Sequence, residues 1–369
     1  MESQNLAMAA LDHPEAFNEE TTVNYDKNNA QVHTSIRHTA INFENLRMLA
    51  GLATLALSGT ALAQNPAAAS YPNRPVTVVT AFAVGSGPDA VLRIVGEKLG
   101  QRWKQSVTVD NRPGGGGFVA IEYARRAKPD GYTLLQLDSE HVSALPYLYK
   151  NKNFNTLDHF DPVAPLFLTP FFVAVPTSSP WKNMADLIRA AKAEPGKISY
   201  GSWGVGSPGH LGGEWLDYLS GSKMTHVPYR EVSQLFTSVA NGDPSWSFGS
   251  LPSSQGIYKS GKIRYIAVAA PKRIPQMPDV PTVAEAGGPA ELDVNSFVSL
   301  LSPKGLDTAT RDKIRSDVVA VLQDPQVREK FSTFAFQPIT WSVPEMQQFA
   351  KKKSEQYKLL IEKAHISLD

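Results

Sequence analysis

The chain contains no cysteine among its 369 residues, so disulfide bonds, thiolate metal sites and a cysteine nucleophile are excluded. It also has no excess of charge of either sign. The 36 lysines and arginines balance 35 aspartates and glutamates, which leaves a formal net charge of +1. A chain this close to neutral provides no electrostatic argument for binding nucleic acid or a membrane surface.

The sequence patterns of several metal and phosphate sites are missing as well. The eight histidines are scattered without the H-E-x-x-H spacing of a zinc site, and there is no G-x-x-x-x-G-K-[ST] loop. We therefore expect neither a metal nor a cofactor. The composition, 42% hydrophobic and 19% charged, is that of a globular protein whose length allows two domains.

An apolar run near the N-terminus has the features of a signal peptide. Met48–Ala63 is too short to span a bilayer comfortably, ends in an A-x-A cleavage pattern, and is preceded by Arg37 and Arg47. We interpret residues 1–63 as leader and signal peptide and 64–70 as a linker, which predicts a periplasmic mature protein. The alternative is that Met48–Ala63 is a buried helix.

Strand and helix patterns alternate through the first part of the mature chain. This order predicts an α/β fold with a mainly parallel sheet. The expected elements are a strand at Val76–Phe82, a helix at Ala90–Trp103, a strand at Val107–Val109, a helix at Phe118–Ala127 and a strand at Tyr132–Leu137.

A second series of strands and helices begins at Phe171–Val175. It predicts helices at Met184–Ala193, Leu211–Leu219 and Gln234–Ala240, between strands at Ile198–Tyr200, Met224–Val227, Trp246–Phe248 and Ile263–Ala269. After a strand at Phe297–Leu301, helical patterns cover Thr308–Leu322, Pro325–Phe334 and Val343–Ala364.

Glycine-rich turns follow three of these strands and precede helices. They lie at Gly85–Asp89, Gly114–Gly117 and Gly201–Gly209. The start of a helix has unpaired N–H groups and a partial positive charge, so it suits an anion. The first two turns are separated by one strand–helix unit and can direct backbone donors into the same cleft.

Two enzyme alternatives share these turns. Gly85-x-Gly87-x-x-Ala90, with Asp110 ending the next strand, matches a dinucleotide fingerprint and suggests a dehydrogenase. Val205–Gly209 is similar to the G-x-S-x-G elbow of hydrolases, but it lacks the first glycine. Export of the chain argues against a nicotinamide cofactor.

Simpler structural roles are available for the same residues. Asp89 fits the first turn of a helix, where it favours the dipole. Ser207-Pro208 fits a helix cap followed by proline at the first helical position. Trp203 and Trp246 fit ordinary packing positions.

From residue 71 to the C-terminus the chain resembles the solute receptors of tripartite tricarboxylate transporters, the Bug family. The resemblance depends on several motifs in a specific order: Tyr71-Pro72-x-Arg74-Pro75, Gly85-Ser86-Gly87-Pro88-Asp89, Asn111-Arg112-Pro113-Gly114-Gly115-Gly116-Gly117, Pro129-Asp130-Gly131-Tyr132, Tyr200–Ser207, His226-Val227-Pro228-Tyr229 and Pro278–Gly287.

The resemblance implies a two-lobed periplasmic binding protein of type II topology, which is not an enzyme. Lobe 1 comprises residues 71–172 and 296–369, and lobe 2 comprises 173–295. The cleft between them holds a small carboxylate near the first turn, partly through ordered water, and Ser202–Ser207 closes on it. The implied partners are inner-membrane permease subunits, and the receptor is expected to be a monomer.

The family also implies which residues contact the cargo. They lie on the turns and at the strand ends that border the cleft: Phe82, Gly85, Ser86, Gly87, Pro88, Asp89, Ser139, Glu140, His141, Trp203, Gly204, Gly206, Ser207, Tyr229, Gly249, Ser250 and Phe297. We expect the lobes to hinge near Phe171–Val175 and Phe297–Leu301. We further expect Gly87→Val to prevent cargo binding without affecting the fold.

Departures from the family pattern concern the type of cargo. Pro88 replaces a common threonine, Gly249 replaces a common aspartate, and Trp203 replaces a small residue. The changes at Gly249 and Trp203 together favour a cargo with a flat ring and without an amine, and His141 or Arg230 is available for a second carboxylate. An orphan receptor that presents its cargo to a sensor kinase is the alternative function.

Overall fold

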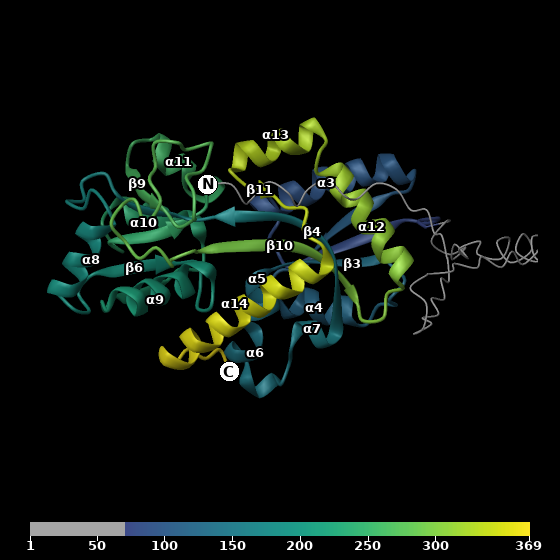
Figure 1. The fold of residues 1–369 in the computed structure, drawn as a ribbon, viewed down its shortest axis with the longest axis horizontal. Coiled ribbons are helices and arrows are strands. Elements are labelled where there is room, and N and C mark those ends of the chain that lie inside the picture. Colours follow the sequence, from purple (N-terminus) through teal and green to yellow (C-terminus); the bar gives the residue numbers. More distant parts are fainter. Residues whose placement is uncertain (1–70) are drawn as a thin grey trace, which may run out of the picture. The chain divides into compact units, whose positions relative to one another are not determined.

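The computed structural model of the protein describes residues 71–369 (Figure 1). The leader, signal peptide and linker expected at residues 1–70 lie outside the described residues. Within residues 71–369, no helix combines the length and apolar character that a membrane crossing requires.

The first sheet of the described chain has six strands in the order β11-β4-β10-β3-β1-β2. Its strands come from two separate parts of the sequence: β1 (Val76–Thr80), β2 (Val107–Asn111), β3 (Thr133–Asp138), β4 (Phe160–Pro170), β10 (Asn295–Pro303) and β11 (Gln337–Pro338).

The second sheet, within the same described range, has five strands in the order β7-β6-β8-β5-β9. All of them lie between the two parts that form the first sheet: β5 (Phe172–Pro176), β6 (Ser199–Ser202), β7 (Thr225–Pro228), β8 (Trp246–Gly249) and β9 (Ile263–Val268). The two sheets give the two-lobed α/β fold expected from the sequence. The lobe boundaries at 172/173 and 295/296 remain a prediction.

Helices connect the strands and cover the sheets. The described helices are α3 (Gly87–Trp103), α4 (Phe118–Arg125), α5 (Ser139–Ser143), α6 (Leu145–Leu148), α7 (Thr156–His159), α8 (Met184–Ala193), α9 (Pro208–Ser220), α10 (Val232–Ala240), α11 (Leu251–Lys259), α12 (Thr308–Val321), α13 (Pro325–Phe334) and α14 (Val343–Lys363). Strands β4 and β11 and helices α5–α7 and α11 have no counterpart among the elements predicted from the sequence.

The expectation of mainly parallel sheets is wrong, because both sheets are mixed. Parallel pairing joins β1 to β2 and β3, and β6 to β7 and β8. Strands β10 and β4 run antiparallel to their neighbours, as does β5 in the second sheet. The chain leaves the first sheet through β4 and returns to it through β10, so these two long strands pair in opposite directions.

The core of the first lobe has the helical stripe that the sequence predicts. Val91, Leu92, Val95 and Leu99 of α3 are almost fully buried and pack in one cluster with residues of β1, β3, β4 and α12. Full burial of one such side chain contributes about 1.5–3 kcal/mol. This packing holds the N-terminal end of α3 at the end of β1, where the first glycine-rich turn lies.

The two crossings between the sheets lie side by side. β4 ends at Pro170 and β5 begins at Phe172, while Asn295 at the start of β10 pairs with Pro170. Figure 1 shows β4 and β10 running alongside each other. This is the region where the sequence analysis expects the hinge.

Candidate functional site

The first glycine-rich turn is fixed by Asp89 in the first turn of α3. Asp89 is 2% exposed and accepts hydrogen bonds from Gly85 N–H at 2.8 Å and from Asn111 Nδ2 at 2.7 Å. Arg93 also pairs with it. Burial would raise the pKa of Asp89, but the bonds from Arg93, Asn111 and Gly85 lower it. The helix-start position is therefore confirmed, and direct contact of Asp89 with cargo remains a prediction.

Of the two glycines in the first turn, Gly87 has a backbone N–H without an acceptor among the described residues, and Gly85 does not. Gly85 N–H is occupied by Asp89, and Phe82 N–H donates to Thr80 Oγ1 at 3.2 Å. The N–H groups of Val84 and Gly87 have no acceptor among the described residues. These two groups are available as donors for an anion at this helix end.

A second helix begins close to the first. A Cβ atom on Gly87 would lie 3.3 Å from Pro252, in the first turn of α11. Ser250 caps α11 without a side-chain bond to its backbone N–H groups, and its hydroxyl donates to Ser253 instead. The starts of α3 and α11, one from each lobe, therefore place two positive dipole ends near each other.

The side chain of Phe336 also leaves no space for a side chain at Gly87. The same Cβ atom would lie 2.8 Å from Cζ of Phe336, a side chain that is 3% exposed. The expectation that Gly87→Val leaves the fold unaffected therefore needs correction, because the added side chain would enter a packed core. Valine at this position would disturb packing as well as cargo approach.

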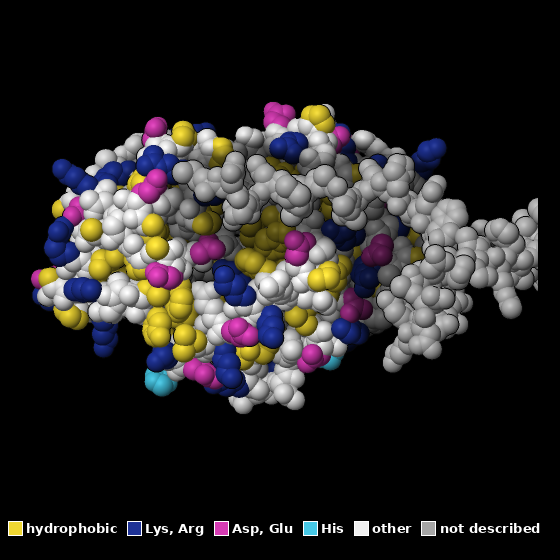
Figure 2. Space-filling model, viewed as in Figure 1, with side chains coloured by type: hydrophobic (Ala, Val, Ile, Leu, Met, Phe, Trp, Pro, Cys, Tyr) yellow, Lys and Arg dark blue, Asp and Glu magenta, His cyan; other side chains and the backbone are white. Residues whose placement is uncertain are grey.

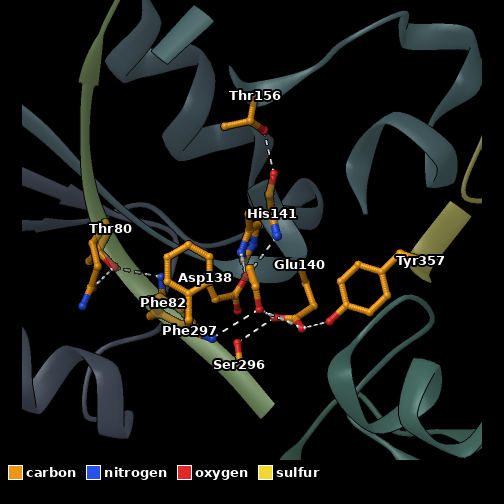
Figure 3. A network of polar contacts seen from close by, with 11 residues as sticks. Thr80, Phe82, Asp138, Glu140, His141, Thr156, Ser296, Phe297 and Tyr357 are labelled. Carbon is orange, nitrogen blue, oxygen red and sulfur yellow. Dashed lines mark hydrogen bonds and ion pairs between the residues drawn. The ribbon is translucent and has the colours of Figure 1, made fainter. Parts of the chain in front are cut away.

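Asp138, the last residue of β3, and His141 of α5 form a close pair (Figure 3). Asp138 caps α5 and accepts hydrogen bonds from the backbone N–H of His141 at 3.0 Å and from its Nδ1 at 2.5 Å. Burial opposes both charges, but the mutual attraction lowers the pKa of Asp138 and raises that of His141. The pair favours an imidazolium beside a carboxylate.

Glu140 points to the opposite side, into the protein (Figure 3). Its carboxyl group accepts hydrogen bonds from Ser139 at 3.1 Å, Ser296 at 2.6 Å and Tyr357 at 2.5 Å. Burial and the neighbouring Asp138 raise the pKa of Glu140 to about 7. The Ser139 hydroxyl also accepts from Phe297 N–H. Cargo contacts by Ser139 and Glu140 stay a prediction, since both side chains are engaged with the protein.

The second glycine-rich turn makes room for His141. A Cβ atom on Gly117 would lie 2.2 Å from Cδ2 and 2.5 Å from Nε2 of this histidine, and the φ angle of Gly117 is +90°. Phe82 of the first turn meets the ring edge-on at 6.0 Å. The two turns therefore meet at the imidazole, whose Nε2 has no hydrogen-bond partner within residues 71–369.

The third turn has the cap that the sequence predicts. Ser207 caps α9, its hydroxyl accepts from His210 N–H, and Pro208 occupies the first helical position. The N–H of Gly206 donates to His210 Nδ1 at 3.0 Å, and that of Gly204 donates to Ser202 Oγ at 3.2 Å. These two glycine donors are thus already used, so any bond from them to cargo would replace an existing one.

The aromatic residues of the second lobe differ in their environments. Trp246 is fully buried, which confirms its packing role. Trp203 is half-buried, with its ring 5.3 Å from that of Phe171 and its edge over Gly209. Tyr229 donates from its hydroxyl to Asp243 O at 3.2 Å. A stacking role for Trp203 toward cargo stays a prediction.

At Gly249 the space for a side chain is filled. A Cβ atom there would lie 2.4 Å from Cζ of Phe236, which is fully buried. The replacement of a common carboxylate by glycine is thus accompanied by an aromatic ring in the same space. Arg230, suggested for a second carboxylate, is exposed.

Side-chain contacts that the sequence did not predict also shape the site. Buried Gln136 accepts from Thr80 Oγ1 at 2.7 Å and donates to the carbonyl of Pro88 at 3.2 Å, which ties β3 to the first turn. His226 stacks on His210 at 3.8 Å. No local sequence pattern predicts either contact, because both join residues distant in sequence.

The geometry does not support the enzyme alternatives. Ser207 is a helix cap, and Nδ1 of the adjacent His210 is already an acceptor for Gly206, so no nucleophile–base pair forms there. Asp110, the acidic residue of the dinucleotide fingerprint, pairs with Arg112 at 2.8 Å. Within the described residues, no three His, Asp or Glu side chains gather where they could hold a metal ion.

The face of the described chain shown in Figure 2 has no large patch of one charge that would indicate a polyanionic partner. Figure 2 shows basic and acidic side chains interspersed on the face that it presents. The site itself relies on helix starts and on one histidine paired with an aspartate. Such a site suits a small anion bound through hydrogen bonds more than a polyanion bound through charge.

Comparison with known proteins is consistent with this geometry. Residues 91–366 match the family described as tripartite tricarboxylate transporter family receptor. A curated relative from Cupriavidus necator, the UPF0065 protein in the gbd 5' region, is 30% identical over 84% of this chain and 94% of its own.

Two solved structures share the fold. The periplasmic binding protein BugD is 28% identical with a TM-score of 0.67, covering 80% of this chain and 99% of BugD. The R. palustris protein Rpa4515, solved with adipate, is 28% identical with a TM-score of 0.72, covering 81% of this chain and all of that one (100%).

Proposed function

This chain belongs to the receptor family of the tripartite tricarboxylate transporters, and from that premise we propose that it captures a small organic carboxylate in the periplasm and delivers it to membrane permease subunits. The function is binding without chemistry. The similarity to Rpa4515, whose structure contains adipate, supports a carboxylate as cargo.

The observation that carries the proposal is the convergence of the starts of α3 and α11. Gly87 and Pro252 bring these two helix ends together, and the N–H groups of Val84 and Gly87 lack acceptors within the described chain. Helix starts with free N–H groups bind carboxylates through hydrogen bonds and the dipole, without needing lysine or arginine.

We propose further that the cargo has a flat ring and lacks an amine. Trp203 offers an aromatic face in the third turn, and Phe236 occupies the space beside Gly249 where a carboxylate would receive an ammonium group. His141, with Nε2 unpartnered in the described part of the chain, supports a second carboxylate on the cargo.

A thermal-shift screen tests the proposal. Purified protein is heated with adipate, succinate, benzoate, terephthalate, glutamate or aspartate, and hits are confirmed by calorimetry. A ligand at 100 times its dissociation constant should add about 2.7 kcal/mol of stability. Stabilisation by acids without an amine supports the proposal. Tight binding of glutamate or aspartate would overturn the cargo assignment, and no response to any acid would count against the function.

A further inference from the structure

The segment that follows α14, residues 365–369, folds back onto the end of α6. The backbone N–H of Leu368 donates to the carbonyl of Leu148 at 2.8 Å, and Oδ1 of Asp369 accepts from the N–H of Asn151 at 3.0 Å. The side chain of Leu368 packs in the same apolar cluster as Leu148. We call residues 365–369 the strap, because they tie the end of α6 to α14.

Leu148 is the contact between this region and the third glycine-rich turn. It is 3% exposed. A Cβ atom on Gly206 would lie 2.6 Å from Cδ1 and 3.2 Å from Cδ2 of Leu148, so the backbone of the turn packs directly against the leucine side chain. Leu148 precedes β4 of the first sheet, whereas Gly206 follows β6 of the second. The leucine therefore limits how closely the third turn can approach the first sheet.

The next residue, Tyr149, contacts the second glycine-rich turn in a similar way. A Cβ atom on Gly116 would lie 2.5 Å from the Tyr149 hydroxyl oxygen, and the φ angle of Gly116 is +60°. The tyrosine ring also meets that of Phe118, the first residue of α4, edge-on at 5.1 Å. Two adjacent residues beside the strap thus each contact one of the turns.

Both turns contain backbone donors that the protein does not use. In the third turn the N–H groups of Val205 and Gly209 have no acceptor among residues 71–369, and in the second turn the same holds for Gly115 and Gly116. A hydrogen bond weakens steeply when its donor is misaligned. The position of each turn therefore determines how many bonds a carboxylate can receive from it.

We propose that Leu148 is a positioning residue for cargo binding, and that the strap and Leu148 together hold the third turn where its free donors reach a bound carboxylate. Leu148 acts through its contact with Gly206 and not through contact with the cargo. The inference rests on the proposed receptor function, and it adds a residue outside the glycine-rich motifs that controls affinity.

A pair of size changes tests the contact between Leu148 and Gly206. Gly206→Ala places a methyl group against the leucine, and Leu148→Ala removes the support of the turn; each should weaken binding by about tenfold, as for one lost hydrogen bond to the cargo. In the double variant the new methyl group occupies space that the leucine has left, so it should bind more tightly than Gly206→Ala. Affinities for adipate and terephthalate are measured by calorimetry. If the two losses simply add in the double variant, the inference is overturned.

Gly196→Ala is the matched control for the glycine change. Gly196 has the same φ angle as Gly206, +79°, with nothing within 4 Å of the added atom. It introduces the backbone strain without the contact, so it should bind cargo like the wild type. Urea unfolding of every variant ensures that affinities are compared between folded proteins.

The strap is tested by Leu368→Ala, which removes an apolar side chain from the cluster that contains Leu148. Its affinity should fall by about threefold to tenfold, and Leu368→Met, which conserves the volume, should restore it. A role in stability alone would lower the free energy of unfolding and leave the affinity of the folded protein unchanged. Wild-type affinity in Leu368→Ala would therefore overturn the inference, even if Leu148→Ala fails to fold.

A measurement without ligand separates this inference from the proposed function. The NMR shifts of the Gly206 and Gly116 amides are compared in the wild type, in Leu368→Ala and in Glu362→Ala, an exposed change on α14. Both amides should shift in Leu368→Ala and stay in place in Glu362→Ala. Unchanged amides in Leu368→Ala would overturn the inference. If both amides shift but neither acid binds the wild type, the result supports the positioning of the turns and counts against the proposed cargo alone.

Discussion

The hydroxyl group of Ser296 donates a hydrogen bond of 2.6 Å to the carboxyl group of Glu140. Ser296 lies on β10, the strand by which the chain returns to the first sheet, and Glu140 lies on α5, directly after β3. Tyr357 of α14 donates to the same carboxyl group. One buried side chain thus links the segment that carries His141 to the crossing between the sheets and to the C-terminal helix.

The first prediction concerns the pH dependence of stability. The pKa of Glu140 is about 7 in the folded protein and 4.5 without the fold. Between pH 4.5 and pH 7, Glu140 keeps its proton in the folded state and has lost it in the unfolded state. The free energy of unfolding therefore falls as the pH rises through this range, by at most roughly 3 kcal/mol. Glu140→Gln should remove this fall, measured by urea unfolding at pH 5.0 and 7.5.

The control for this prediction is Glu355→Gln on the exposed side of α14. It should retain the wild-type pH dependence. If Glu140→Gln and the wild type lose the same stability between the two pH values, then Glu140 does not titrate in this window.

The second prediction concerns Gly87. Its Cβ position is 2.8 Å from buried Phe336, so Gly87→Ala should destabilise the fold by about 1–3 kcal/mol through overpacking. The matched control is Gly256→Ala on α11, where nothing lies within 4 Å of the added atom. It should be neutral or slightly stabilising, because alanine favours helix. When Phe336→Leu is added to Gly87→Ala, part of the lost free energy of unfolding should return, as measured by chemical denaturation. If none returns, another contact is responsible for the loss.

The third prediction tests the flat-ring cargo through Trp203. Aromatic stacking contributes about 0.5–1.5 kcal/mol beyond buried area, so Trp203→Ala should weaken an aromatic acid about tenfold and leave a short aliphatic acid nearly unchanged. Because Trp203 also packs on Phe171, Trp203→Phe is the control that keeps a ring. Calorimetry with terephthalate and succinate measures the difference. An aromatic cargo that binds Trp203→Ala as tightly as the wild type would contradict the stacking role.

The fourth prediction concerns export and follows from the A-x-A pattern that ends at Ala63. Protein isolated from the periplasm should begin at or near Gln64, as N-terminal sequencing or intact-mass measurement would show. A periplasmic protein that still contains Met48–Ala63 would refute the signal-peptide interpretation.

Elements whose signals are local could be predicted from the sequence. The period of apolar residues and the end signals predict Pro325–Phe334 and Met184–Ala193 with the bounds that the structure has. Ser207-Pro208 predicts the start of α9 because a cap and a proline act within one helical turn. The ordered motifs were sufficient to identify the family, since each retains its residues and its place along the chain.

Features that depend on partners distant in sequence could not be predicted from local patterns. Strand β4 contains Pro162 and Pro165, which argue against a strand in the sequence, yet β10 accommodates them through register shifts at Val298/Ser299 and Leu300/Leu301.

The same limit applies to the site. The glycines at 87 and 117 belong to turns predicted to bind an anion, and only the fold shows that Phe336 and His141 also occupy the space beside them. The sequence predicts a cargo contact for Glu140, and only the fold shows that Ser296 and Tyr357 already donate hydrogen bonds to its carboxyl group. A side chain's partner is set by what the folded chain places within a few ångströms of it, and no pattern of neighbouring residues carries that information.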